Sequence, residues 1–296
     1  MTSALLLACC LAPIQQTDVA DFSKVIARAG KDEVTEGHLQ LVAMLSGHSE
    51  VSPKLRKELT RRLVETRYVT RFLKRSGFRI NSAELAQASR DARKRLVVRD
   101  IDLRKRLRAM KLTESDLRKE LEVHKLWTRY KIKTLTNDKL KARFAERKVQ
   151  YDGTRCRVSQ VFLKVADDAG WAKAERELLK IREQLAGEKM SFAEAARGLS
   201  DSPSARSGGD IGWFPYSGLM PESFTKHAFA LKKGEVGLPF RSRFGAHLIK
   251  VTDIDPGDLS LEDARSVIYR QLEQEAWNAI IADEKRKTAE PKPASR

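Results

Sequence analysis

Apolar residues recur every three or four positions through residues 51–150, a spacing that predicts a succession of amphipathic helices. Four short polar residues that can cap a helix stand three or four positions before a leucine: Ser52, Ser82, Thr113 and Asn137. The leucine pattern after Ser82 continues to Leu107, which predicts one long helix. Gly and Pro are scarce here and the outer faces are polar, so we expect an extended helical module.

A short lead-in precedes this module. Residues 25–29 have the composition of a strand, and a turn follows at residues 30–32. Thr35 is placed to cap a helix that carries Leu39 and Leu45.

The pattern changes after Gly153. Residues 157–165 alternate strongly enough for a strand, and residues 171–185 carry apolar positions spaced three and four apart, as in an amphipathic helix. The further elements are a short helix capped by Ser191, strands over residues 210–214, 238–242 and 246–251, and a helix over residues 220–231. This order predicts a second domain of mixed α and β structure.

A final helix is predicted from about Leu261 to Asp283. It cannot bury its apolar stripe alone, so we expect it to pack on the helical module. The divisions that follow are a leader at 1–21, a helical module at 22–151, a strand-containing domain at 152–256, a C-terminal helix at 257–284 and a disordered tail at 285–296.

Composition and charge limit the classes of protein to which this chain could belong. Hydrophobic residues make up 41% of the chain, and no apolar run approaches the roughly 18 residues that a spanning helix needs, which excludes an integral helix bundle or channel. Residues 52–150 hold 31 Lys/Arg against 12 Asp/Glu, a net charge of +19, so the rest of the chain carries 17 − 19 = −2. Such a surface could serve nucleic acid, an acidic membrane surface or unfolded polypeptide, and most often it is only solvated. Neither zinc-ligand spacing nor an RNA-binding signature is present, so no nucleic acid partner is expected.

The chain opens on an apolar run from Ala4 to Ala12 that resembles a secretory leader without a basic beginning. Residues 6–9, Leu-Leu-Ala-Cys, also resemble the lipobox of bacterial lipoproteins, in which the cysteine carries the lipid. Three interpretations stay open: export, membrane association through a lipidated Cys9, and a truncated start. We expect an extracytoplasmic location in the periplasm or cell envelope. Only Cys156 lies in the body of the chain, so no disulfide framework or thiolate metal site is expected.

Three linked blocks give the second domain a specific resemblance. They are SFAEAARGLSDSPSARSGGDIGWF at residues 191–214, GLMPESFTKHAFALKKGEVGLPF at 218–240 and FGAHLIKV at 244–251. Their order and spacing resemble the parvulin (PpiC, rotamase) family of peptidyl-prolyl cis/trans isomerases over residues 157–253. The resemblance implies an α+β fold, with a small antiparallel sheet flanked by helices, attached to an all-α module. That layout is similar to the SurA-like and PrsA-like extracytoplasmic foldases, which implies that the helical module at 22–151 is chaperone-like.

The family's chemistry follows from the physics of the peptide bond. Rotation about an X-Pro bond has a barrier of roughly 18 to 20 kcal/mol and takes tens of seconds unaided. Because no bond is made or broken, a catalyst need only bind the twisted amide better than either planar isomer. No metal or cofactor is required.

The resemblance places Met220 and Phe224 in the socket for the proline ring, with Ile211 close by. By spacing alone, Met220 and Phe224 would be ordinary helix packing. His247 corresponds to a family histidine of the active-site floor, and support of a hydrogen-bond network is as open a role for it as direct catalysis. Ser242 matches a hydroxyl position on the third strand, although an exposed surface serine is the plain alternative.

One departure from the family bears on catalysis. Gln160 stands where the family has a second histidine, and glutamine forms hydrogen bonds but cannot titrate. Ser202 stands where some members carry Cys or Asp, which removes a thiolate. A mechanism that needs paired imidazoles is therefore in doubt, whereas amide distortion is not.

Two functions follow from the resemblance. The first is a prolyl isomerase and folding chaperone that acts on proline-containing unfolded or newly exported polypeptides. The alternative is a holdase that binds peptide through a parvulin fold with little or no turnover. Gln160 favours the second, and the intact socket with His247 favours the first.

Overall fold

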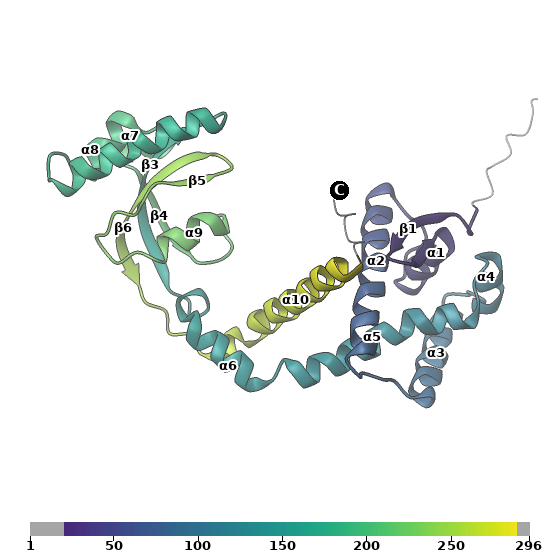
Figure 1. Ribbon diagram of the computed structural model, residues 1–296. Helices are drawn as coiled ribbons and strands as arrows, with labels where there is room; N and C mark the ends of the chain where they lie inside the picture. The colour runs from purple at the N-terminus through teal and green to yellow at the C-terminus, as the bar shows by residue number, and fades with distance from the viewer. Residues whose placement is uncertain (1–20, 289–296) are drawn as a thin grey trace, which may run out of the picture. The chain divides into compact units, whose positions relative to one another are not determined.

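The computed structural model describes residues 21–288 of the chain. The predicted lipidation site at Cys9, and nearly all of the predicted leader, lie outside the described residues. The chain divides into two compact units (Figure 1). Among the described residues, one unit, here the N-terminal unit, contains 21–134 together with 274–288, and the other, the sheet unit, spans Leu135–Glu273.

The N-terminal unit is a β-hairpin followed by helices. Its elements are β1 (Val25–Ala29), β2 (Asp32–Thr35), α1 (Glu36–Leu45), α2 (Pro53–Arg75), α3 (Ser82–Val97), α4 (Leu103–Ala109) and α5 (Glu114–Thr134). The predicted strand at residues 25–29 is confirmed, and its antiparallel partner β2 occupies a stretch for which only a turn and a helix cap were predicted. The predicted cap Ser52 is confirmed, since its side chain accepts from the third backbone N–H of α2. The predicted caps Ser82 and Asn137 are wrong by one residue, because Asn81 caps α3 and Thr136 caps the helix Asn137–Glu146 in the same way.

The single helix predicted from Ser82 to Leu107 is wrong. The chain leaves α3 after Val97, passes through Asp100 at φ 54°, and re-enters a helix at Leu103. The leucine pattern runs on because both helices bury their apolar side chains in one core, which also holds Leu41, Leu117 and Met110. Apolar periodicity reports burial and cannot by itself detect a turn between two helices on the same core.

The last helix, α10 (Leu261–Thr288), contributes to the core of each unit. In the sheet unit, Ala264, Ile268 and Leu272 are buried with Leu140 and Tyr151. In the N-terminal unit, Ile280 and Ile281 are buried with residues of α2 and α5. The helix continues to Thr288, so residues 285–288 of the predicted tail are helical, and residues 289–296 lie outside the described part of the chain.

The sheet unit contains a four-stranded antiparallel sheet in the order β4-β3-β6-β5. Its elements are α6 (Asn137–Glu146), β3 (Arg155–Lys164), α7 (Asp168–Ala186), α8 (Phe192–Leu199), β4 (Asp210–Pro215), α9 (Glu222–Ala228), β5 (Phe240–Ser242) and β6 (Gly245–Asp255), with a 3₁₀ turn at Pro203–Ser207. The predicted α+β class, with a small antiparallel sheet flanked by helices, is confirmed.

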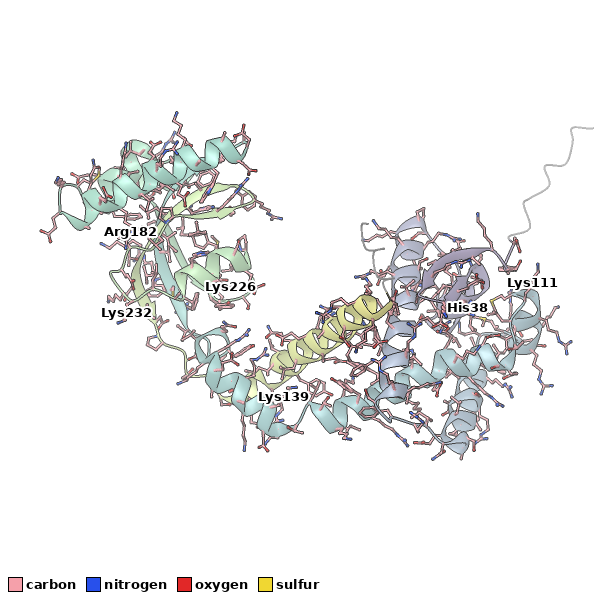
Figure 2. All side chains as sticks on the ribbon, viewed as in Figure 1. His38, Lys111, Lys139, Arg182, Lys226 and Lys232 are labelled. Atoms are coloured by element: carbon pink, nitrogen blue, oxygen red, sulfur yellow. The ribbon has the colours of Figure 1, made fainter. Side chains whose placement is uncertain are left out.

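Helices cover both faces of this sheet. On one face, α7 and α8 pack on Val161 and Leu248, and on the other, α9 packs with Val158 and Ile249 (Figure 1). Successive side chains of a strand point to opposite faces, so even positions of β3 and odd positions of β6 lie on the side of α9. Arg182 of α7 (Figure 2) also donates from Nε to a backbone oxygen of the segment before β5.

Two glycines allow other segments to approach the backbone of β3 closely. A Cβ at Gly209 would lie 2.5 Å from the carbonyl oxygen of Gln160, and a Cβ at Gly245 would lie 2.4 Å from that of Leu163. Both glycines have positive φ, 85° and 147°, which side chains rarely tolerate.

No helix among residues 21–288 combines the length and apolar character needed to cross a membrane.

Candidate active site

The loop after α8 is bonded along β3, and this positions the predicted site. Ser200 accepts the backbone N–H of Phe162 on its Oγ at 3.0 Å, and Asp201 donates its own N–H to the carbonyl oxygen of Phe162 at 2.7 Å. Further along, the backbone N–H of Gln160 donates to the carbonyl oxygen of Gly209 at 2.9 Å. These bonds hold the loop beside the strand that carries Gln160.

A continuous run of hydrogen bonds joins the four residues predicted to act on the amide. Nε2 of Gln160 donates to Oγ of Ser202 at 3.2 Å, and Oε1 of Gln160 lies 3.1 Å from Nδ1 of His247. The other ring nitrogen of His247, Nε2, lies 2.8 Å from Oγ of Ser242. Three separate segments of the chain therefore meet at one polar cluster.

The proton positions in this cluster follow from the donors and acceptors. An amide oxygen only accepts, so Nδ1 of His247 carries its hydrogen toward Gln160. In a neutral ring Nε2 is then a bare acceptor, and the hydroxyl of Ser242 donates to it. The backbone N–H of Phe244 donates to Oγ of Ser242 at 3.0 Å, which orients that hydroxyl. Gln160 thus holds His247 in a single tautomer.

Aromatic rings enclose the imidazole. Phe240 stacks on His247 with centroids 5.1 Å apart, Phe224 meets it edge-on at 5.6 Å, and Phe162 lies 5.0 Å away. Burial, followed by the nearby His227, lowers the pKa of His247 from 6.5 to about 4. His247 is therefore neutral near pH 7, as the tautomer argument requires.

The three residues predicted to hold the proline ring lie in one apolar cluster on the same sheet face. Phe224 is 2% exposed, and the half-buried Ile211 and Met220 pack against its cluster. Since Phe224 also contacts His247, the apolar and polar parts of the predicted site adjoin. The structure brings the seven predicted residues into one region.

Sequence reasoning missed several members of this region. Ser202 contacts Ser204 through their hydroxyl oxygens at 2.9 Å, which extends the polar run by one residue. Phe162 and Phe240 form part of the ring cage around His247. Two signals for these residues were available in the sequence. Ser204 follows Ser202 across Pro203, and Phe162 lies two positions after Gln160, on the same face of the strand.

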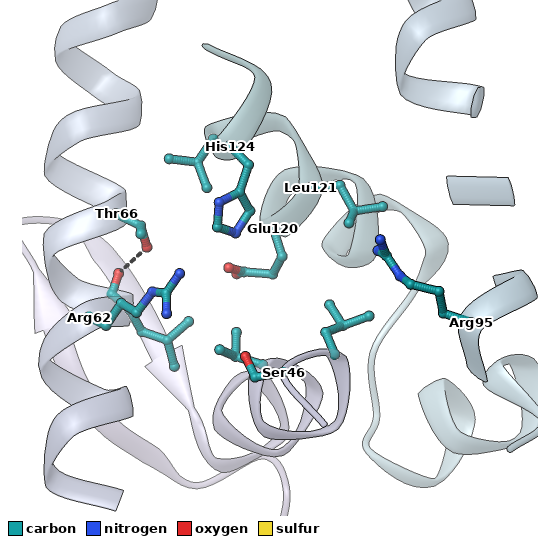
Figure 3. A pocket seen from close by; sticks show the side chains of 11 residues that line it. Ser46, Arg62, Thr66, Arg95, Glu120, Leu121 and His124 are labelled. Atoms are coloured by element: carbon teal, nitrogen blue, oxygen red, sulfur yellow. Dashed lines mark hydrogen bonds between the residues drawn. The ribbon is translucent and has the colours of Figure 1, made fainter. Parts of the chain in front are cut away.

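The N-terminal unit contains a second candidate site, a pocket of about 190 Å³ lined from α1, α2, α3 and α5 (Figure 3). Leu45 and Leu63 form part of its aliphatic wall. Arg62 and Arg95 stand on opposite sides, with Glu120 between them in this view. Neither arginine forms an ion pair with a described carboxylate, so both charges are available at the mouth.

Glu120 at this pocket is already neutralised by a buried partner. It pairs with Arg67, and their side chains are only 5% and 13% exposed. Burial raises the pKa of Glu120, and the charge of Arg67 opposes that rise. The pocket therefore presents net positive charge above an aliphatic wall.

Part of the chain is similar to known proteins. The rotamase family model, described as the PPIC-type PPIASE domain, matches residues 160–253. The foldase protein PrsA of Bacillus subtilis (strain 168) is 37% identical over 113 residues, which cover 38% of this chain and 36% of that protein. The chaperone SurA of Saccharophagus degradans is 34% identical over 136 residues, 43% of this chain and 31% of that protein. A crystal structure of the peptidylprolyl isomerase PrsA from Bacillus cereus aligns over 93% of this chain and 95% of its own, at 18% identity and a TM-score of 0.45.

The sheet, its helices and the family match identify residues 160–253 as a rotamase domain of the PPIC type, the parvulin class. The predicted resemblance is confirmed for this segment. The matched segments span about a third of the length of the curated relatives named above.

Proposed function

We propose that the chain is a peptidyl-prolyl cis/trans isomerase and folding chaperone, with isomerisation at the cluster of Gln160, Ser202, Ser242 and His247. The observation that carries the proposal is a fully paired polar run that adjoins an apolar cluster around Phe224. A proline site needs these two surfaces side by side, one for the ring and one for the amide.

The site has to make or break no bond, but it has to lower the high barrier to rotation about the X-Pro bond. A planar amide is more dipolar than a twisted one, because twisting interrupts the resonance between nitrogen and carbonyl. Apolar surroundings therefore favour the twisted form relative to water, and hydroxyl groups fixed by their neighbours can interact with the amide without reorganising. We assign the apolar surroundings to Met220, Phe224 and Ile211, the polar contact with the amide to the hydroxyl of Ser202, and to Ser242 the support of His247 through the hydrogen bond that it donates to Nε2.

The glutamine in place of a family histidine is compatible with this mechanism. Gln160 accepts from His247 and donates to Ser202, so both hydrogen-bonding capacities of its amide are used. Amide rotation requires no proton transfer, and His247 with a pKa of about 4 is not in the imidazolium form that acts as a general acid near pH 7. We therefore assign His247 and Gln160 to positioning.

The experiment is the rate of cis/trans exchange in a panel of X-Pro peptides, followed by protease-coupled assay or exchange NMR. Met220→Ala and Ser242→Ala should each lower the acceleration, because they remove socket surface and a hydroxyl. Ser223→Ala, on the exposed side of α9, is the matched control and should leave it unchanged. Phe224→Ala is a weaker choice, since truncation of a phenylalanine buried to this extent costs about 3–5 kcal/mol of unfolding free energy.

Absence of acceleration with retained peptide binding would support the holdase alternative. Gln160→His separates the two functions further. A large gain in isomerase rate would indicate that the glutamine impairs the site. An unchanged rate would agree with a positioning role that glutamine fills.

The chaperone activity is assigned to the N-terminal unit, and the pocket with Arg62 and Arg95 supports it. An aliphatic wall below two available cations suits a nonpolar side chain that neighbours an acidic one in an unfolded client. Ser46→Trp should fill this pocket from its exposed rim and weaken suppression of client aggregation. Ser49→Trp, exposed in the following loop, is the control, and equal activity in the two variants would refute the assignment.

Domain limits and location complete the proposal. The isomerase domain spans 152–256, between a helical module at 22–151 and a C-terminal helix at 257–284. The clients are proline-containing polypeptides that are unfolded or newly exported, and the location is extracytoplasmic, with Cys9 as the lipidated residue in an anchored form. Incorporation of labelled fatty acid into the wild-type chain, and its loss in Cys9→Ala, would test the anchor.

A further inference from the structure

The last residue of α3 and the first residue of the turn that leads to α4 form an exposed apolar pair. Val97 is 70% exposed and Val98 is 88% exposed, although valine is among the residues most often buried. The turn is bonded to the rest of the unit, since Arg99 donates to the carbonyl oxygens of Met44 at 3.0 Å and Gly47 at 3.2 Å. The pair is therefore held on a supported turn.

Basic residues flank this pair along the chain. Residues 94–111, here called the α3–α4 knob, contain eight Lys/Arg and two Asp, a net charge of +6. Lys111, near the end of α4 (Figure 2), faces Asp21 at 3.5 Å. The cations of the knob that are exposed and form no ion pair with any residue in the described part of the chain are Lys94, Arg95, Arg104, Lys105, Arg106 and Arg108.

The fold of α4 explains why three of these cations are exposed. Leu103 and Leu107 are buried in the core with α1 and α5, so the positions between them face outward. Arg104, Lys105 and Arg106 occupy those positions. The knob therefore combines unpaired cations with an apolar tip.

We infer that the α3–α4 knob binds the surface of a membrane that contains anionic phospholipids. Lysine and arginine near such a surface are attracted to the lipid phosphates, and exposed apolar side chains enter the boundary between headgroups and acyl chains. Single-stranded nucleic acid, another polyanion, is bound with the help of aromatic side chains, and residues 82–112 contain none. This contact is independent of isomerisation and of any lipid on Cys9.

The test uses flotation with phosphatidylcholine vesicles, with and without phosphatidylglycerol, and the full chain synthesised without membranes so that it carries no lipid. The chain should float only with phosphatidylglycerol, and less as salt rises. Arg104→Glu with Lys105→Glu should weaken binding at least about tenfold. Lys54→Glu with Lys57→Glu makes the same change in net charge at exposed positions of α2 and should retain binding.

The apolar pair separates a membrane from a soluble polyanion. Val97→Ser with Val98→Ser should weaken vesicle binding at least about tenfold, because both side chains leave water in the bound state. Ile132→Ser, at an exposed site of α5, is the matched control and should bind as the wild type does. Circular dichroism verifies that each variant is folded. Vesicle binding that is insensitive to the valines, or equal in the two charge-reversal variants, would overturn the inference, as would valine-independent binding to polyphosphate at the same affinity.

Discussion

The protonation of His247 provides a sharp test of the geometry at the site. The ring is 6% exposed, three phenylalanines surround it, and its Nδ1–H donates to Gln160. Burial, and then the nearby His227, lower its pKa from 6.5 to about 4. We therefore expect the ring proton signals of His247 to titrate with a midpoint near pH 4 in NMR spectra, whereas an unperturbed histidine would titrate near 6.5.

The depressed pKa has a calculable effect on stability. An unfolded chain protonates this histidine near pH 6.5 and the native chain near pH 4, so the unfolded state holds one more proton between these values. The contribution of the neutral ring is fully present above pH 6.5 and is lost as the pH falls toward 4, at about 1.4 kcal/mol per pH unit. Over that window the loss is about 3 kcal/mol. This is a large share of the free energy of unfolding, which is about 5–15 kcal/mol for most folded proteins.

The matched variant is His247→Gln, which keeps one donor and one acceptor but cannot titrate. Its missing signals assign the histidine resonances, and urea unfolding at several pH values should show a shallower loss of stability below pH 6.5 than the wild type. Peptide isomerisation by the wild type should stay flat from pH 8 to about 5, because the ring keeps one charge state there. A midpoint at pH 6 to 7, or equal pH slopes for the two proteins, would refute the argument from burial and the single tautomer.

Three further substitutions test other parts of the structure. Gln160→Glu places a carboxylate beside Nδ1 of His247 and should raise the pKa of that ring, measured by the same titration, while an unchanged pKa would show that the two side chains are not in contact. Gly245→Ala should lower the free energy of unfolding by about 1–3 kcal/mol more than Gly218→Ala, since both have positive φ but only the first Cβ meets backbone, and equal urea midpoints would contradict this. Glu120→Ala leaves its arginine partner buried and unpaired, for an expected loss of about 3–5 kcal/mol in urea unfolding, and a loss below 1 kcal/mol would mean that the pair is solvated.

The helices and strands were largely predictable because their signals are local. The strand at residues 25–29 and the amphipathic helix at 171–185 follow from apolar spacing and end near where the structure ends them. The missed turn at residues 98–102 shows the limit of that reasoning. Both flanking helices face one core, so the leucine period continues across a turn that is held by bonds from Arg99 to distant carbonyl groups.

The candidate site likewise has features that the sequence predicts and features that it does not. The identities of Gln160, His247, Met220 and Phe224 could be selected from the sequence, because a family motif preserves order and spacing along the chain. The contacts between them could not be predicted from the sequence, since the hydrogen bond between Gln160 and His247 joins residues far apart in the chain. The phenylalanine at 240 joins the cage around the imidazole only because β5 pairs with β6.

The sequence alone determined the class of the second domain, the basic character of the helical module and the residue types available for chemistry. Only the tertiary structure decided that the imidazole of His247 is buried, held in one tautomer and neutral near pH 7. The same holds for Val97 and Val98, which look like core residues in sequence and are exposed in the fold. The physical reason is that pKa, tautomer and exposure depend on the groups packed around a side chain, and those groups come from distant parts of the chain.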